Sequence, residues 1–275
     1  MKRTTYIMIG MLLAGLVIIS VSMFYTATHG TRWEDKFMEI KGTQKTVQLP
    51  SCKVVKLVQP MEWKQKKEGI VETERYVAFS DVPLKITPAD TLQGSFSFAG
   101  DMESFMTMTS VGDTLLISFQ FPNDKLEKRF HNDRLLRLRS TEMALNLPAS
   151  VQTVRVDLID METTFYDFRC DTLSFQVRGL AKVENCHIAS LAAQAHILHL
   201  NSGEVDNLYL NLDQTSNWNV EPDSFHLNTE HLSGSSKHHC TLVKGECQRV
   251  LWTPQTEGAT LNVELMQAAT IEVNE

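Results

Sequence analysis

The most prominent hydrophobic feature of the chain is an uninterrupted apolar run from Tyr6 to Tyr25. It spans 20 positions without a charged residue, and an α-helix rising about 1.5 Å per residue needs about that many residues to cross the hydrocarbon of a bilayer. Aromatic residues at both ends, Tyr6 and then Phe24 with Tyr25, suit the interfacial zones of a membrane. The run therefore predicts a transmembrane anchor over residues 6–25.

Two basic residues, Lys2 and Arg3, precede this run. The excess of positive charge on the cytoplasmic side of membrane helices places residues 1–5 in the cytoplasm and the bulk of the chain on the other side. A cleaved signal peptide would have a shorter apolar region and a small-x-small cleavage site. The nearest candidate, Ala27–His29, has no small residue at its last position, so we expect an uncleaved, single-pass anchor.

Residues 26–45 follow the apolar run and are expected to form a juxtamembrane stalk. Trp33, Phe37 and Ile40 recur at i, i+4 and i+7, a spacing that allows a short amphipathic helix. Such a helix would either lie on the outer headgroups or pack on the domain that follows, and we favour the second.

From Thr46 onward the hydrophobic period shifts from 3.6 to 2, which is typical of half-buried strands. Turn residues such as Gly112 and Asp113 separate these runs. A helical interlude is plausible at Asn123–Arg139, although part of that segment also alternates. The strand-like runs are Val47–Leu49, Lys53–Val58, Val82–Ile86, Ser95–Phe98, Thr114–Phe121, Arg137–Arg139, Ala144–Leu147, Val205–Leu212, Ser216–Val220, Arg249–Trp252, Thr260–Leu265 and Thr270–Val273.

A degenerate internal repeat marks the second half of the chain. Leu173–Leu180, Leu198–Val205 and Phe225–Leu232 align as apolar-x-apolar-polar-x-x-x-apolar, with starting points 25 and 27 residues apart. Repeats made of strands and polar turns suit a stacked β-solenoid, because one unit cannot bury its apolar side chains alone. We predict an all-β domain over residues 46–275, parallel β-helix or solenoid in type and repeat-like over 150–275; a β-sandwich is the alternative.

The order of an anchor, Val82–Ile86, Gly112–Ile117 and the coil-like repeats from Leu173 to Leu232 resembles the adhesin-type, right-handed β-helix domains of bacterial cell envelopes. These domains are often called auto-transporter adhesin head-like. The similarity covers roughly residues 80–275. It implies a location in a bacterial cell membrane, with the C-terminal domain extracytoplasmic and periplasmic, and a binding or structural role.

The formal net charge of −7 argues against a nucleic-acid partner, since affinity for a phosphate backbone needs clustered Lys and Arg. Two local basic patches interrupt this acidic balance. We interpret both mainly as solvated surface, with a contact to anionic lipid or glycan as the alternative. They comprise Lys64, Lys66 and Lys67, and Lys125, Lys128, Arg129, Arg134, Arg137 and Arg139.

Five cysteines lie in what should be an oxidising compartment. Cys170 and Cys186 flank one predicted strand pair, and Cys240 and Cys247 bracket a possible hairpin. Either pair could form a disulfide, though an odd total that includes Cys52 leaves at least one thiol over. Buried free cysteines acting as small apolar side chains are the alternative.

No recognised catalytic or metal-binding pattern supports an enzyme. Gly-x-Ser-x-Gly, His-Glu-x-x-His and a phosphate-binding Gly loop are absent, and His238–Cys240 with Cys247 lacks zinc-ligand spacing. We therefore predict no catalytic residue, no metal and no cofactor. Five carboxylates could still line one groove of a solenoid, as in β-helices that cleave polysaccharides: Asp157, Asp160, Glu162, Asp167 and Asp171.

Asp-Thr-Leu occurs three times and places a hydroxyl at Thr91, Thr114 and Thr172. The tripeptide resembles the Asp-[Ser/Thr]-apolar acceptor for O-glycosylation of Bacteroides-type envelope proteins. Asp-Thr is also a natural strand-entry turn, because the Asp side chain accepts hydrogen bonds from nearby backbone N–H groups. Both interpretations stay open.

Together these patterns favour a membrane-anchored envelope protein with a non-catalytic, adhesin-like binding or structural module. Its partners would be the membrane through the N-terminal helix and another envelope protein or a glycan. A regulatory partner of a membrane signalling system is one alternative, although only residues 1–5 precede the anchor. A carbohydrate-active β-helix enzyme is the other.

Overall fold

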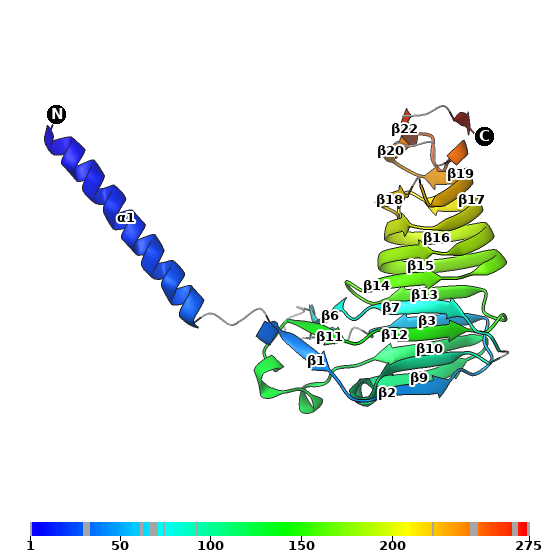
Figure 1. Ribbon diagram of the computed structural model, residues 1–275, viewed down its shortest axis with the longest axis horizontal. Helices are drawn as coiled ribbons and strands as arrows, with labels where there is room; N and C mark the ends of the chain where they lie inside the picture. Colours follow the sequence, from blue (N-terminus) through cyan, green and yellow to red (C-terminus); the bar gives the residue numbers. More distant parts are fainter. Residues whose placement is uncertain are drawn as a thin grey trace. The chain divides into compact units, whose positions relative to one another are not determined.

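The computed structural model describes residues 2–29, 34–60, 63–65, 71–73, 75–91, 93–221, 223–242, 247–265 and 269–273. The chain divides into two compact units, Met1–Phe37 and Met38–Glu275. The first unit is mainly helical and the second is built almost wholly of strands (Figure 1). An all-β region preceded by one apolar helix is thereby confirmed.

The first unit contains helix α1 (Lys2–His29). Its segment Tyr6–Thr26 has a mean hydropathy of 2.5 and no buried position, and is long and apolar enough to cross a membrane. The hydroxyls of Ser20 and Thr26 donate to the carbonyls of Leu16 and Ser22, each at 2.8 Å. These bonds give both hydroxyls a partner within the helix, as an apolar environment requires.

The stalk differs from the expectation of a short amphipathic helix. Trp33 lies outside the described residues, η1 (Glu34–Lys36) is a single 3-10 turn, and β1 (Phe37–Ile40) is a strand. Phe37, Met38 and Ile40 are all buried. Three apolar side chains in four residues satisfy a helical or an extended backbone equally well, and pairing with β11 decides for the strand.

The second unit also begins earlier than the predicted residue 46. Its N-terminal part contains β2 (Gln44–Gln48), β3 (Val54–Val58), β4 (Trp63–Gln65), β5 (Val71–Thr73), β6 (Tyr76–Asp81), β7 (Leu84–Pro88), β8 (Ser95–Ala99), η2 (Gly100–Phe105), β9 (Met106–Val111), β10 (Thr114–Phe119), η3 (Asn123–Lys125), η4 (Lys128–Phe130), β11 (Leu135–Ser140) and β12 (Met143–Leu147).

The C-terminal part contains β13 (Thr153–Asp157), β14 (Glu162–Tyr166), β15 (Arg169–Glu184), β16 (Cys186–Leu200), β17 (Gly203–Asn211), β18 (Asn217–Val220), β19 (Phe225–Gly234), β20 (Lys237–Leu242), β21 (Cys247–Pro254), β22 (Thr260–Leu265) and β23 (Thr270–Val273).

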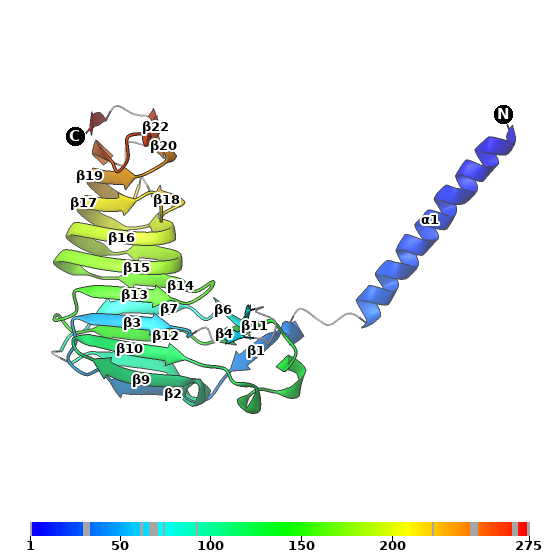
Figure 2. The same ribbon diagram turned by 180° about the vertical axis from the view of Figure 1, so that it is seen from behind.

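Parallel pairing dominates this second unit. One column of strands runs β3, β13, β15, β16, β17, β19, β21 and β23, each parallel to the next. A second column runs β7, β14, β15, β16 and β18, also parallel. The long strands β15 and β16 belong to both columns, with a register shift between Val177 and Leu180. Figures 1 and 2 show β13, β15, β16, β17 and β19 lying one above another.

The core lies between the two columns. Along the first column Val154 pairs with Phe175, Phe175 with Ala193, and Ala193 with Leu210; all four are buried. Phe165 of the second column stacks on Phe175 with ring centroids 4.0 Å apart. Because side chains alternate along a strand, the same alternation that buries these residues turns their neighbours outward.

The register of the paired strands has a shorter spacing than the repeat seen in the sequence. Leu173 pairs with Leu191, and Leu191 pairs with Leu208, so successive strands of the first column are offset by 18 and 17 positions. Leu198 instead pairs with Ala181, in the second column, whereas Phe225 pairs with Gly203 at the start of β17. The three similar segments therefore do not occupy equivalent positions in the columns, because an apolar-x-apolar pattern recurs in both.

The predicted helical interlude at Asn123–Arg139 is replaced by η3, η4 and the strand β11. The Arg75 guanidinium holds this segment by donating hydrogen bonds at 2.8 to 3.4 Å, mostly to backbone carbonyls. Its acceptors are the carbonyls of Phe121, Phe130, His131 and Asp133 and the side-chain oxygen of Asn123.

Candidate functional site

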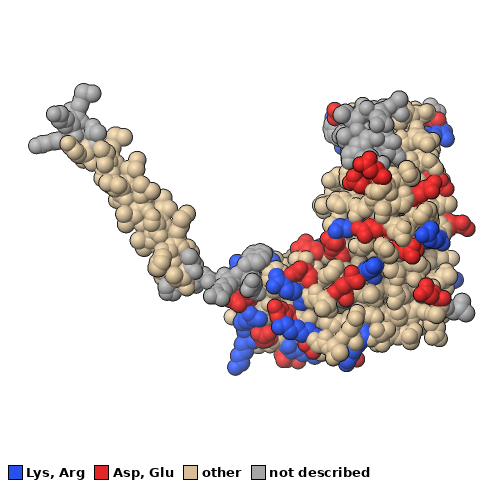
Figure 3. All heavy atoms as spheres, in the orientation of Figure 1, with Lys and Arg blue, Asp and Glu red and all other residues tan. Residues whose placement is uncertain are grey.

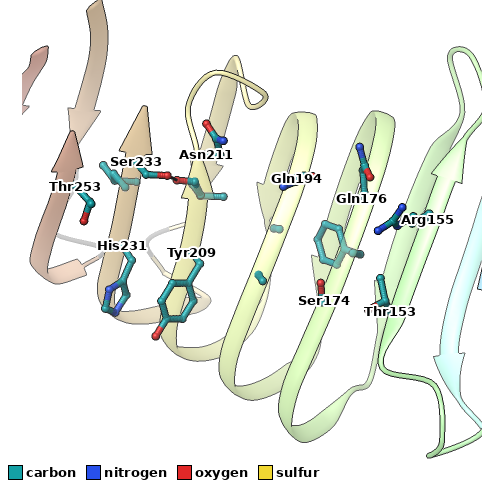
Figure 4. Close-up of a pocket in the computed structure, with 15 residues that line it drawn as sticks. Thr153, Arg155, Ser174, Gln176, Gln194, Tyr209, Asn211, His231, Ser233 and Thr253 are labelled. Carbon is teal, nitrogen blue, oxygen red and sulfur yellow. Dashed lines mark hydrogen bonds between the residues drawn. The ribbon is translucent and has the colours of Figure 1, made fainter. Parts of the chain in front are cut away.

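The outer face of the first column carries two adjoining hollows, of about 440 and 480 Å³, which both touch Arg155, Gln176 and Gln194. We call them together the groove. The groove crosses β3, β13, β15, β16, β17, β19 and β21, so its long direction follows the stacking of the strands (Figure 4).

One polar side chain from each of these strands lines the groove, in a series that we call the polar row. Lys56 pairs with Arg155, Arg155 with Gln176, and Gln176 with Gln194. With neighbouring strands about 4.8 Å apart, seven strands place the ends of the row roughly 29 Å apart. The polar row consists of Lys56, Arg155, Gln176, Gln194, Asn211, Ser233 and Thr253.

The direction of these side chains follows from strand geometry. Gln176 lies between the buried Phe175 and Val177, and Gln194 lies between the buried Ala193 and Ala195. A side chain flanked by two inward-facing residues on a strand has to point outward. Neither glutamine side chain forms a hydrogen bond within the described part of the chain, so both amides are available to a ligand.

Beside the polar row lies an aromatic pair, Tyr209 on β17 and His231 on β19. The two residues are register partners, and their rings stack with centroids 4.2 Å apart at 15°. Figure 4 shows both rings on the outer face, and Tyr209 is 43% exposed. The neighbouring position on β16 is Ala192, whose small side chain leaves room beside the tyrosine ring.

The imidazole of His231 belongs to this pair as a neutral ring. Burial, followed by the charge of Arg249, lowers the pKa of His231 below its usual value. Its Nε2 lies 3.1 Å from Oδ1 of Asn207, which fits a neutral ring that donates from this nitrogen. At neutral pH the aromatic pair is therefore an uncharged, flat surface.

The charge of the groove is opposite in sign to that of the chain. Its charged side chains are Lys56, Arg155, Arg178 and Asp157, three cations against one carboxylate. Arg178 and Asp157 lie 3.4 Å apart and neutralise one another. Lys56 and Arg155 lack an ion-pair partner among residues that the structure describes.

The carboxylates considered for hydrolysis do not gather at one place. Asp157 lines the groove, whereas Asp167 lines a different hollow. Glu162 is 2.6 Å from Lys182, and Asp167 is 3.4 Å from Arg169. Asp160 and Asp167 have φ angles of 56° and 61° at turns, a conformation that aspartate tolerates better than most residues. Turns and ion pairs account for most of this cluster.

His238 brings together serine, histidine and aspartate, but not in a catalytic order. Its Nε2 atom lies 3.1 Å from Oδ1 of Asp213 and 3.3 Å from Oγ of Ser236. A nucleophilic triad uses the two ring nitrogens separately, one for each neighbour. The side chain and then the backbone N–H of Ser235 lower the pKa of Asp213, and both carboxylate oxygens of Asp213 accept from that N–H. The side chains of His239 and Cys240 lie outside the described residues.

Three cysteines carry free thiols, Cys52 and Cys186 in buried positions and Cys170 in a half-buried one. The structure shows no bond between Cys170 and Cys186, one of the two bridges that the sequence left possible. Cys170 pairs in register with Ile188, two positions beyond Cys186. The thiol of Cys186 donates to the Glu184 carbonyl at 3.2 Å. A bridge between Cys240 and Cys247 stays a prediction.

The three Asp-Thr-Leu threonines occupy different places. Thr91 and Thr172 are exposed, while Thr114 begins strand β10 and is half-buried. The hydroxyl of Thr91 donates to the Gln93 carbonyl at 2.8 Å, as a turn residue does. Glycosylation of these threonines stays a prediction.

The basic patch at residues 125–139 is interleaved with acids. Arg129 lies 2.9 Å from Glu127, and Arg139 lies 2.5 Å from Asp81. Figure 3 shows Lys and Arg side chains next to Asp and Glu on the side where β1 and β11 lie. This arrangement fits a solvated surface. Of the other patch, Lys66 and Lys67 lie outside the described residues, as does the side chain of Lys64.

No known family model matches this chain, and no curated protein matches it. Among solved structures, the chain is similar to a candidate adhesin from Bacteroides fragilis NCTC 9343, with 11% identity, a TM-score of 0.45 and coverage of 86% of this chain and 100% of the other. A candidate lipid-binding protein from Parabacteroides distasonis ATCC 8503 shares 11% identity, with a TM-score of 0.31 and coverage of 86% and 99%. A candidate adhesin from Parabacteroides merdae ATCC 43184 shares 6%, with a TM-score of 0.28 and the same two coverages.

Proposed function

We propose that this chain is a membrane-tethered envelope protein whose β unit binds an extended ligand in the groove and performs no catalysis. The observation that carries the proposal is the polar row, in which successive parallel strands present one outward polar side chain each. Because these side chains repeat at the spacing of the strands, the polar row suits an extended ligand that is itself built of repeating units.

The finer architecture belongs to the same proposal. We infer that the two columns are walls of a parallel β-solenoid, as the membership of β15 and β16 in both columns supports. The buried Phe165–Phe175 contact between the columns supports it as well. The antiparallel strands β2, β8 and β9 would close the end of the stack.

The location follows from helix α1. An uncleaved span over Tyr6–Thr26 would hold the β unit at the outer surface of a bacterial membrane, with Lys2 and Arg3 on the cytoplasmic side. The groove on the β unit would then be accessible to molecules of the cell envelope rather than to those of the cytoplasm.

The proposal is tested by probing glycan and peptide arrays with the labelled full-length chain in lipid nanodiscs. We expect a reproducible signal for one ligand class, which a double variant, Gln176→Ala with Gln194→Ala, loses. The matched control is Gln44→Ala combined with Gln152→Ala, two exposed glutamines outside the groove, which should keep the signal. Absence of signal on both arrays, or a signal that the groove variant retains, would contradict a binding groove.

A further inference from the structure

We propose that the ligand of the groove is an acidic oligosaccharide that lies across the strands, along the polar row. This inference rests on the proposed function, because it names the ligand of the same groove. It is carried by the charge of the groove, the aromatic pair and the free amides between them.

The first argument is charge. Lys56 and Arg155 are register partners on β3 and β13, so two cations stand side by side about 4.8 Å apart at the strand level. Like charges on directly paired strand positions repel. Within the described residues no carboxylate compensates them, in a chain whose net charge is −7. A carboxylate or sulfate between the two side chains would remove the repulsion and accept paired N–H groups from the guanidinium.

The second argument is the aromatic pair. Tyr209 and His231 present a flat, neutral surface at the same face as the cations. Sugar rings carry one face of C–H groups that packs on aromatic rings, while their hydroxyls stay at the edge. From β13 to β17 there are three strand steps, so Arg155 and Tyr209 lie roughly 14 Å apart along the stack. A ligand that uses both must therefore be a chain of about three or more sugar residues.

The third argument is the amide pair between these two ends. Gln176 and Gln194 each offer a carbonyl acceptor and an NH₂ donor, and the alternating donor and acceptor character of sugar hydroxyls matches both. The rise per residue of an extended β-linked glycan is also close to the strand spacing, so one sugar would meet one strand.

A peptide fits the same surface less well. Affinity for an extended peptide generally comes from backbone hydrogen bonds to an open sheet edge. Beneath the groove, β13, β15, β16, β17 and β19 already pair with neighbours on both sides. Only side chains are left to bind, and they match hydroxyls and an anionic group.

The test measures calorimetric binding of three probes to the full-length chain in phosphatidylcholine nanodiscs: β-linked hexamannuronate, cellohexaose and hexaglutamate. We expect hexamannuronate to bind best, with affinity falling at least about tenfold in Lys56→Gln, in Arg155→Gln and in Tyr209→Ala. Raising the salt concentration from about 50 mM to about 500 mM should weaken binding of the acidic glycan. Lys85→Gln, on β7 outside the groove, is the control that should bind as the parent does. Unchanged thermal melting of each variant shows that the fold is kept.

Three results would overturn the inference. If cellohexaose binds equally well and the two cation variants bind normally, the groove is a site for neutral glycans. If hexaglutamate binds most tightly, the ligand is an acidic peptide. Each of these results leaves the proposed binding function standing. If none of the three probes binds, the acidic-glycan assignment is wrong, and the array experiment decides separately whether the groove binds anything.

Discussion

At the residue scale, the thiol of Cys186 illustrates what enclosure does to reactivity. Burial raises the pKa of Cys186 to about 11, so at pH 8 only roughly one thiol in a thousand is ionised, and the thiolate is the reactive form. We expect Cys186 to resist labelling by a disulfide reagent in the folded chain, while the half-exposed Cys170 reacts faster. Peptide mass spectrometry after timed labelling measures both rates, and equal rates would contradict the prediction.

His231 gives the groove a dependence on pH. Its lowered pKa means that the unfolded chain takes up a proton on this ring at a higher pH than the folded chain does. The free energy of unfolding therefore decreases as the pH falls from above 6.5 through the lowered pKa. We expect the melting temperature to fall between about pH 7.5 and about pH 5, and to fall less in His231→Gln. Gln152→Ala, which changes an exposed side chain without a titratable group, should keep the parent slope. The same slope in both variants would contradict the prediction.

At the element scale, Gly203 lets strands β16 and β17 approach closely. Its φ angle is 123°, and a Cβ atom there would overlap the backbone carbonyl and nitrogen of Cys186 at the start of β16. Gly203→Ala should lower the free energy of unfolding by about 2–4 kcal/mol, because strain and overlap act together. Gly258 has open space around it, so Gly258→Ala should change stability by less than about 0.5 kcal/mol. Urea unfolding compares the two, and similar midpoints would refute the argument.

Arg75 donates five hydrogen bonds to the segment at residues 121–133. Arg75→Lys keeps the positive charge but loses the planar guanidinium, whose several N–H groups donate to different carbonyls at once. We expect a loss of about 2–3 kcal/mol and faster tryptic cleavage at Lys125 and Lys128. Arg155→Lys, an exposed arginine, is the matched control. Wild-type cleavage rates in Arg75→Lys would show that the segment is held by other contacts.

How much of the fold could be predicted is clearest from particular elements. The alternation in Thr114–Phe121 predicted a strand, and β10 confirms it, because burial of every second side chain leaves a local pattern. The register between strands left no such pattern, since Leu173 and Leu198 belong to different columns although the sequences around them are similar. Phe37–Ile40 was mistaken for part of a helix because its pairing partner, β11, is distant in sequence.

The groove was missed for the same reason. Gln176 and Gln194 each sit between two apolar residues, which marks them as outward-facing, but only the 18-residue register shows that they are neighbours. With the repeat set at 25 and 27 residues, Arg155, Gln176 and Gln194 do not line up. The carboxylates and histidines were candidates because of their residue types, whereas most of them lie at turns or form ion pairs.

At the scale of the whole molecule, helix α1 should decide where the chain resides. We expect the full-length chain to remain in the membrane pellet after alkaline carbonate extraction, and a variant without residues 6–26 to be released. Leu16→Arg, near the middle of the span, should shift the chain toward the soluble fraction, because an arginine there costs about 2.5–3.5 kcal/mol. Leu16→Ala is its control. A mature chain that begins beyond residue 26 would show instead that the segment is a cleaved signal.

One consequence of the parallel column concerns how such a protein changes over generations. Each strand of the column contributes one side chain to the polar row, and it pairs only with the strands on either side. Duplication or loss of one strand with its connection would lengthen or shorten the groove by about 4.8 Å and leave the other side chains of the polar row unaltered. The length of the groove and the chemistry of its side chains can therefore evolve separately, the first by copying strands and the second by single substitutions such as one at Gln194.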